Sequence, residues 1–578
     1  MEIFGSILSL AFVVGIVVIV VVAARRRVPG GVDAHSVRRF FQYVLLFALY
    51  VVVAIGLAEL LGRAFGAVPG EYEDPGADLA QALAFLLVGG PVAAGLSWWT
   101  WRRHRAEPDE TDSGLFVAYV TITALVGLFV AATALQGVLA DALGGRFDPD
   151  GLGVLLAWGA VWAGHWWLAR RALDATRGAP HLLLGSLVGL AMAAAGLVMA
   201  LGAALDVLLR PGTASGTTLG LIEGASLLVT GALVWTGYWL MGAARLARDT
   251  WWLAFVLLAG VGGGLVATLA AASQLLWSLL VWFVGDRAGA DAAMHFASAT
   301  TQFATLVTGG LVWWYHRTML GEHREERTEV RRVYEYLVAG IGLIAAAAGV
   351  GTVLVAFVEA VTPGVDLGMT VRNTLLGGLT ALLVGAPVWW LLWTRIRRAV
   401  ASDPGTEVPS LTRRIYLVVL FGIAGIAAVV ALIAAAVILF NDVIDGQVSG
   451  VTIRSLRYAL GVLVATAAVS AYHGAIFGQD RARGIARASG PRSIVLVGPA
   501  DPDAARALAR STGARVEVWG RLDVATPPWD ADALGAALAG MGGDLLVVAD
   551  LVGWRVVEID PSGRRAARAP APAEVKPS

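Results

Sequence analysis

The chain is 578 residues long, 57% hydrophobic and only 15% charged, with a mean hydropathy of +0.72. Soluble globular proteins carry about 25% charged residues, so this composition excludes a wholly soluble chain and indicates a protein that lies mostly in lipid. Its 43 basic residues balance 43 acidic ones, and it contains no cysteine. We therefore expect no nucleic-acid partner, no disulfide, no thiol catalysis and no cofactor.

Long apolar runs dominate the chain. A helix needs roughly 20 apolar residues to cross about 30 Å of hydrocarbon, and thirteen runs without charge approach or exceed this length. They lie at about 3–24, 40–58, 79–101, 114–140, 151–169, 181–205, 224–244, 250–285, 292–316, 336–358, 373–394, 415–440 and 458–479. The first run begins without a basic segment and is followed by Arg25 to Arg27, so we expect a retained anchor and no cleaved signal peptide.

Arginines gather in every second connection between these runs, whereas the other connections are poor in arginine and often acidic. By the positive-inside rule the arginine-rich connections are cytoplasmic. Thirteen crossings then place the N-terminus outside and the C-terminus in the cytoplasm. The expected fold is an all-α polytopic membrane protein surrounded by membrane lipids, with a small soluble domain at the end.

The twelve runs after the anchor form six similar hairpins. The returning helix of each hairpin carries a valine close to an aromatic cluster, and successive valines are 69, 73, 78, 76 and 81 residues apart. These valines are Val92, Val161, Val234, Val312, Val388 and Val469. Outgoing helices also match, as in Arg38-Arg39-Phe40-Phe41-Gln42-Tyr43 and Arg331-Arg332-Val333-Tyr334-Glu335-Tyr336. Six copies of a hairpin, or three of a four-helix unit, predict a pseudo-symmetric bundle of parallel repeats.

The chain resembles a bacterial membrane family, domain of unknown function 5671, in three features: the paired arginines with their tyrosines, a glycine 17 residues further on, and the aromatic helix ends. The unit of that family is a set of about four helices. The resemblance covers residues 37 to about 480 as three tandem units and implies a bacterial inner (plasma) membrane protein, with no activity or site to carry over. The predicted parts are an anchor at 1–36, membrane units at 37–175, 176–322 and 323–484, a cytoplasmic α/β domain at 485–565 and a disordered tail at 566–578.

Three histidines occupy one aligned position in the second, fourth and sixth hairpins: His165, His316 and His473. If the units surround a pseudo-threefold axis, the three imidazoles could converge on a zinc or similar ion. No carboxylate recurs nearby to orient them. Histidines that hydrogen-bond headgroups or backbone near the membrane surface are the interpretation that we favour over a metal.

Few ionisable residues lie within the runs. Glu223 is the deepest, and Glu59, Asp206 and Glu359 lie toward the outer ends of outgoing helices. A polar ring at the outer boundary explains them, and a ligand or permeation mouth is the alternative. Their scarcity argues against a proton-coupled pump. Thirteen of the 21 tryptophans sit at the inner helix ends, where an interfacial belt is the favoured interpretation and an aromatic-lined vestibule the alternative.

The last segment has the composition of a soluble protein. It predicts strands at 493–497, 514–519, 544–549 and 555–559, and helices at 502–511 and 531–539, the first capped by Asp501. Its first loop lacks the glycines and lysine of a nucleotide site, so the default is a protein-interaction or regulatory module. We expect a noncatalytic membrane scaffold or sensor that acts through residues 485–565 and a cytosolic protein partner. A transporter or channel for a neutral or lipidic solute is the alternative, and an intramembrane enzyme that uses the three histidines is a third hypothesis.

Overall fold

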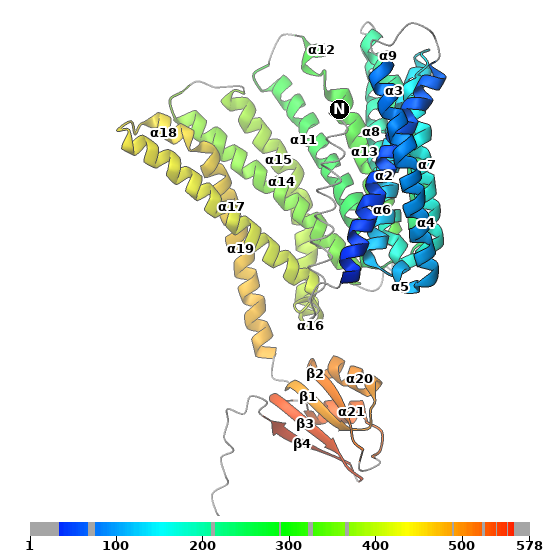
Figure 1. Cartoon of the computed structure of the whole chain (residues 1–578). Coiled ribbons are helices and arrows are strands. Elements are labelled where there is room, and N and C mark those ends of the chain that lie inside the picture. The colour runs from blue at the N-terminus through cyan, green and yellow to red at the C-terminus, as the bar shows by residue number, and fades with distance from the viewer. Residues whose placement is uncertain are drawn as a thin grey trace, which may run out of the picture. The chain divides into compact units, whose positions relative to one another are not determined.

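The computed structural model describes residues 34–66, 75–209, 214–287, 291–321, 328–364, 369–487, 491–522, 526–538, 540–551 and 553–559. The predicted anchor at 3–24 and the predicted tail at 566–578 lie outside these residues. The chain divides into two compact units, residues 1–396 with 429–465 and residues 397–428 with 466–578. The first holds most of the apolar helices, and the second holds the α/β domain (Figure 1).

The described residues contain eleven helical stretches that are long and apolar enough to cross a membrane, and each coincides with a predicted span. They are α2 (Ala34–Phe65), α3 (Pro75–Ala84) with α4 (Gly90–Ala106), α6 (Gly114–Leu143), α7 (Pro149–Ala172), α8 (Ala175–Leu209), α9 (Ala214–Trp235), α10 (Thr250–Ala254) with α11 (Gly263–Phe283), α14 (Glu329–Val361), α15 (Val371–Ser402), α17 (Leu411–Ile444) and α19 (Arg457–Arg487). This is a multi-pass helical membrane protein.

The predicted span at 292–316 also forms a helix, α13 (Ala299–Met319), but this helix is not among the eleven. Its first three turns hold Thr300, Thr301, Gln302, Thr305 and Thr308, which lower its hydropathy. The total of thirteen spans therefore stays a prediction. Shorter helices, α5 (Pro108–Thr111), α12 (Ala292–His295), α16 (Pro404–Glu407) and α18 (Gly450–Ser455), lie in the connections.

Three π-helical turns interrupt the long helices. Phe85–Gly89 joins α3 to α4, Thr236–Leu240 extends α9, and Phe255–Gly262 joins α10 to α11. Such turns shift the register of the residues that follow, which re-aims side chains at the helix ends. Hydrophobic periodicity alone predicts one uninterrupted helix at each of these places.

The first and fourth helices of every predicted four-helix unit lie against each other. α2 packs on α7 and α8 packs on α13. In the third unit, α14 approaches α19 so closely that a Cβ on Gly351 would lie 3.1 Å from the carbonyl oxygen of Gly461. Small residues let helix backbones approach in lipid, where dispersion and close packing drive association.

One contact recurs within four consecutive hairpins. A Cβ added to a glycine of the outgoing helix would lie 2.4 to 2.9 Å from the backbone nitrogen of a tryptophan on the returning helix. The pairs are Gly127 with Trp162, Gly189 with Trp235, Gly264 with Trp313 and Gly342 with Trp389. Each tryptophan directly follows one of the aligned valines. In the sixth hairpin the same position is Ser470, whose hydroxyl lies 3.2 Å from a Cβ on Gly425.

The α/β domain contains every element that the sequence predicts. Its sheet has the order β2-β1-β3-β4, formed by β1 (Pro491–Gly498), β2 (Arg515–Gly520), β3 (Gly543–Ala549) and β4 (Trp554–Ile559). β1 pairs in parallel with β2 and β3, and β4 is antiparallel to β3. The helices are α20 (Pro502–Thr512), whose first backbone amides are capped by Asp501, and α21 (Ala531–Leu538). Their Leu508, Leu534 and Leu538 form a core with inward residues of β1 and β3.

Candidate functional site

A buried carboxylate, Glu110, lies in α5 among the arginines at the arginine-rich end of the first four-helix unit. Its side chain is 1% exposed. Arg39 Nε donates to Glu110 Oε2 at 2.9 Å, Arg38 donates to Oε1, and Arg103 lies 3.9 Å from Oε1. Burial raises the pKa of Glu110, but the hydrogen bonds and charges of Arg39 and Arg38 outweigh burial and hold the pKa below its usual value. The side chain is therefore an ionised carboxylate at neutral pH.

Hydrogen bonds extend this cluster along α2 and α4. Arg38 also donates to the side-chain oxygen of Gln42 at 2.8 Å, and the Gln42 amide donates to Thr100 Oγ1 at 2.8 Å. One turn further, the Tyr43 hydroxyl lies 3.1 Å from His104 Nε2, and Thr111 Oγ1 lies 3.4 Å from His104 Nδ1. The motif at the start of α2 therefore ties α2, α4 and α5 together.

A second polar group lies deeper in the same unit, around His165. Tyr43 stacks on Tyr119 with ring centroids 5.2 Å apart, and the Tyr119 hydroxyl lies 3.0 Å from His165 Nε2. The rings of His165 and Tyr50 pack edge to face with their centroids 4.8 Å apart, and the Tyr50 hydroxyl lies 3.1 Å from the Ser97 hydroxyl. The rings and hydroxyls thus connect α2, α4, α6 and α7 with each polar atom satisfied, as buried polar groups require.

The third four-helix unit has a buried acid in the corresponding connection. Glu407 in α16 is 2% exposed, and Ser410 follows it by three residues, as Ser113 follows Glu110. Arg332 pairs with Glu329 at 2.7 Å, and Arg331 pairs with Glu335 at 3.3 Å. The paired arginines that start these units are therefore neutralised by nearby carboxylates in both.

The three aligned histidines are all buried. Each Nδ1 donates at 2.8 Å to the backbone carbonyl four residues earlier, those of Val161, Val312 and Val469. His316 packs on Trp239 and Phe255, and His473 on Tyr416 and Tyr472. Among the described residues, no group of three or more histidine, aspartate or glutamate side chains could hold a metal ion. The three-histidine metal site, which the sequence does not favour, has no support among these residues, where each ring is held by a carbonyl of its own helix.

Glycine makes room for two rings at this aligned position. A Cβ on Gly260 would lie 2.2 Å from the His316 ring, and a Cβ on Gly185 would lie 2.1 Å from the Tyr238 ring. Both rings thus press directly onto the backbone of the outgoing helix. Tyr238 also accepts a hydrogen bond of 2.8 Å from Trp162 Nε1 of the preceding hairpin.

The outer acids mostly join helices of one unit. Asp206 Oδ1 accepts from the Thr300 hydroxyl at 2.7 Å, which links α8 to α13. Glu359 accepts from Arg457 Nε at 2.8 Å, which links α14 to α19. Glu59 pairs with Arg63 of its own helix at 2.7 Å. The first two contacts link helix ends, and both interpretations of the acids, a polar ring at the outer boundary and a ligand or permeation mouth, stay predictions.

Glu223 has different surroundings. It is half-buried on α9, beside Gly224, where a Cβ would lie 2.4 Å from the backbone nitrogen of Ala200 on α8. Within the described part of the chain, no hydrogen bond or ion pair engages its carboxylate. It is the most distinctive of the predicted ligand candidates, and that role also stays a prediction.

The inner tryptophans do not form one uniform belt. Trp239 and Trp393 are buried, Trp162, Trp166, Trp235, Trp313 and Trp389 are half-buried, and Trp98, Trp99, Trp101, Trp167, Trp314 and Trp390 are exposed. Several of them stack under an arginine four residues later, as Trp166 does under Arg170 with 5.0 Å from the guanidinium carbon to the ring centre. The exposed members have the amphipathic character of residues at the headgroup level, and the buried ones pack between helices.

Two regions of the chain, residues 39–160 and 332–468, match the family described as Domain of unknown function (DUF5671). These regions are DUF5671 domains. Arg39 and Glu110 belong to the first, and Glu335 and Glu407 belong to the second. The predicted middle unit at 176–322 lies outside both matches, so the arrangement of three tandem units stays a prediction. No curated protein and no solved structure matches the chain.

Sequence reasoning missed Glu110 and Glu407 because it searched the apolar runs for ionisable residues and passed over the connections. A signal for them exists in the sequence. In each DUF5671 domain a proline-containing connection after the tryptophan-rich helix holds a glutamate, followed three residues later by a serine: Glu110 with Ser113, and Glu407 with Ser410.

Proposed function

We propose that this protein is a noncatalytic membrane scaffold or sensor, in which the helical bundle anchors the α/β domain and that domain binds a protein partner. The observation that carries the proposal is a face of the sheet that neither of the described helices of this domain, α20 and α21, covers; we call it the uncovered face. Side chains alternate along strands, so Val495 and Val497 of β1 and Leu546 and Val548 of β3 point away from the helix-covered core. All four are half-buried.

Neighbouring strands extend this apolar face. Val557 of β4 lies opposite Leu546, and Trp519 of β2 lies opposite Val497 and is 59% exposed. Charges border it, with Arg515 paired to Glu517 at 3.0 Å and Arg555 opposite Val548. Parallel strands in α/β proteins usually have both faces covered. An apolar centre with an exposed tryptophan and a charged rim is the composition typical of a protein-binding surface.

The last span, α19, runs from the bundle toward the α/β domain. α19 continues without a break past the predicted end of its span to Arg487, and β1 begins at Pro491. Near that end, Arg413 Nε and Asp480 Oδ2 form a buried pair at 2.6 Å. A helix rises about 1.5 Å per residue and resists bending, so a displacement of the last span would be passed on to the α/β domain. This supports a sensing role beside simple anchoring.

The experiment uses the full chain, which has no native cysteine. Trp519→Cys places a thiol on the uncovered face, and Arg510→Cys places one on the exposed side of α20. In inverted membrane vesicles from the native cell, we expect a maleimide to label Arg510→Cys readily and Trp519→Cys slowly. Both should label readily after purification in detergent.

The same Trp519→Cys thiol, carrying a photo-reactive group, should then give one discrete adduct in the native membrane that Arg510→Cys does not give. Equal labelling of both thiols in vesicles, with no adduct, would contradict the proposal. Uptake of a neutral or lipidic solute by reconstituted vesicles, unaffected by changes at Trp519, would favour the transporter alternative instead.

A further inference from the structure

The end of α4 carries three tryptophan–arginine pairs, and they differ in how their charge is neutralised. The guanidinium carbon of Arg103 lies 5.0 Å from the ring centre of Trp99, and its Nη1 lies 3.9 Å from Oε1 of the buried Glu110. Arg102 and Arg105, in contrast, pair with no carboxylate in the described part of the chain. Each instead stacks on an indole ring. The guanidinium carbon of Arg102 lies 4.9 Å from the ring centre of Trp98, and that of Arg105 lies 3.9 Å from the ring centre of Trp101.

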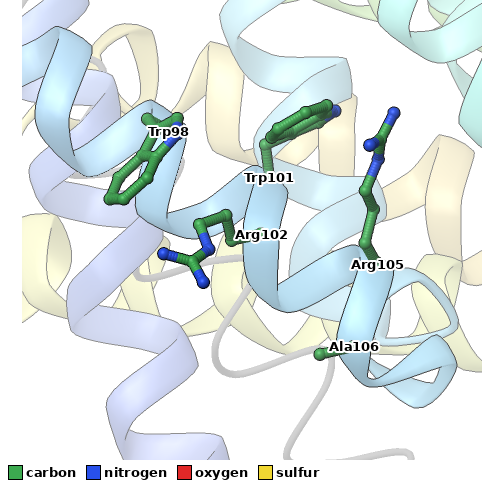
Figure 2. Close-up of a pocket in the computed structure, with 5 residues that line it drawn as sticks. All are labelled: Trp98, Trp101, Arg102, Arg105 and Ala106. Carbon is green, nitrogen blue, oxygen red and sulfur yellow. The ribbon is translucent and has the colours of Figure 1, made fainter.

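These two unneutralised pairs line a surface groove of about 460 Å³ together with Ala106. Figure 2 shows Arg102 turned toward Trp98 and Arg105 standing beside Trp101, all on one helix. Trp98 is 56% exposed and Trp101 is 51% exposed, although a buried position would be favourable for either ring. The groove thus combines two cations with two open aromatic surfaces.

An apolar stripe runs along the same helix into the groove. Pro91, Ala94, Trp98 and Trp101 follow one another at intervals of three and four residues, which places them on one face of α4, and all are exposed. Leu87, also exposed, lies just before them in the π-helical turn Phe85–Gly89. Arg105 continues this face by one turn. In a helix long and apolar enough to cross a membrane, such a face lies against acyl chains and its last turn lies at the headgroup level.

We propose that this groove binds the headgroup of an anionic phospholipid such as phosphatidylglycerol. A guanidinium stacked on an aromatic ring keeps its N–H groups free in the ring plane, and that fork matches two oxygens of one phosphate. Arg102 and Arg105 together supply two positive charges that no carboxylate of the described residues neutralises. The acyl chains then follow the stripe from Trp98 to Leu87. A free phosphate ion would bind the two arginines but would make no contact with the apolar stripe.

The test compares the purified, delipidated full chain with the variant Arg102→Gln/Arg105→Gln in detergent. Native mass spectrometry counts bound phosphatidylglycerol and phosphatidylcholine during titration. An arginine near an anionic membrane surface contributes about fivefold in binding, so the double variant should lose one tightly held phosphatidylglycerol, with about 25-fold weaker binding at that site. Arg506→Gln/Arg510→Gln removes the same charge from exposed positions on α20 and should bind as the wild type does.

Two further measurements separate the lipid from other ligands. Trp98→Leu/Trp101→Leu keeps the charge and should also weaken binding, since it removes the stacking surface that holds the guanidinium groups. Inorganic phosphate at millimolar concentration should not displace the lipid. The proposal is overturned if Arg102→Gln/Arg105→Gln binds phosphatidylglycerol like the wild type, if phosphatidylcholine binds the site equally well, or if phosphate displaces the lipid.

Discussion

At the scale of single residues, the most informative group is the buried carboxylate of Glu110. A lone charge in that place would be costly, yet Arg38 and Arg39 donate to both of its oxygens. The acid in turn permits two arginines to sit side by side at the start of α2. The paired arginines, which the sequence presents as a marker of cytoplasmic orientation, therefore also hold the helix ends together.

Replacing this acid tests that role. Glu110→Gln removes the carboxylate charge to which Arg38 and Arg39 donate, and we expect the free energy of unfolding to fall by about 2 to 3 kcal/mol at pH 7. This is less than for a fully buried pair, because both arginines are partly exposed. Thermal unfolding in detergent measures this loss. Asp112→Asn, which breaks the exposed pair with Arg177, is the matched control and should change stability little.

The pH dependence of this effect has a definite sign. The pKa of Glu110 is lower in the folded chain than in the unfolded chain, so its stabilising contribution is complete above the unfolded value of 4.5. It disappears as the pH falls through the folded pKa. Wild type and Glu110→Gln should therefore differ most near neutral pH and converge in acid. A difference that stays constant between pH 7 and pH 3 would contradict an ionised Glu110.

The sequence predicts some of these side chains better than others. The sequence favours histidines that hydrogen-bond headgroups or backbone. Each of the three aligned histidines does bond to the carbonyl one turn earlier, a contact that needs no distant partner. Glu110 depends on partners 71 and 72 residues away. Such a contact leaves no trace in local periodicity, and only the matching Glu407 with Ser410 gives a hint of it.

At the scale of helices and strands, prediction succeeds where one local signal dominates. Apolar length locates the spans, and alternation with the Asp501 cap locates the strands and α20. The π-helical turns at Phe85–Gly89 and Phe255–Gly262 could not be predicted, because they arise where a packed neighbour demands a shift of register. Gly260 lies within the second of these turns, directly against His316.

The glycine contact between paired helices gives a prediction at this scale. Gly264→Ala would place a methyl group 2.6 Å from the backbone nitrogen of Trp313, so α11 and α13 must move apart. We expect a loss of about 1 to 3 kcal/mol, measured by unfolding in detergent. Gly310→Ala in α13 meets no atom within 4 Å and should be neutral or slightly stabilising, since alanine favours a helix. Equal effects of the two changes would show that backbone approach is not the cause.

The pair between α17 and α19 allows a second test. Asp480→Asn removes the carboxylate charge to which the buried Arg413 donates, and we expect it to lower the midpoint of thermal unfolding clearly. The double change Arg413→Met/Asp480→Leu should recover most of that stability, because an apolar pair of similar volume avoids the cost of burying charge. If the double variant is as unstable as Asp480→Asn, packing and not charge determines the effect.

At the scale of the whole molecule, the two DUF5671 domains and the unmatched middle segment share the same internal contacts. The glycine–tryptophan contact occurs in the hairpins of Gly127, Gly189, Gly264 and Gly342, two of which lie in the middle segment. The contact of first with fourth helix also occurs there, between α8 and α13. This supports a third diverged unit, whose divergence includes the replacement of the paired arginines that begin the others.

The predicted thirteen spans would place the two ends of the chain on opposite sides of the membrane, and α19 offers a local test of this topology. The loop after α17 and the α/β domain are separated by α19 alone, so they must lie on opposite sides if that helix crosses the membrane. The chain contains no native cysteine, and single thiols at Gln447 and Arg510 report on these two places. Both positions are exposed.

In intact cells from which any outer layer has been removed, we expect a membrane-impermeant maleimide to label Gln447→Cys at once. Arg510→Cys should label only after the membrane is opened, because the positive-inside rule predicts that the arginine-rich connections and the α/β domain lie in the cytoplasm. The reverse pattern would show the opposite orientation of the bundle. Labelling of both thiols from the same side would show that α19 does not cross, which would also remove the mechanical link to the α/β domain on which the sensing role depends.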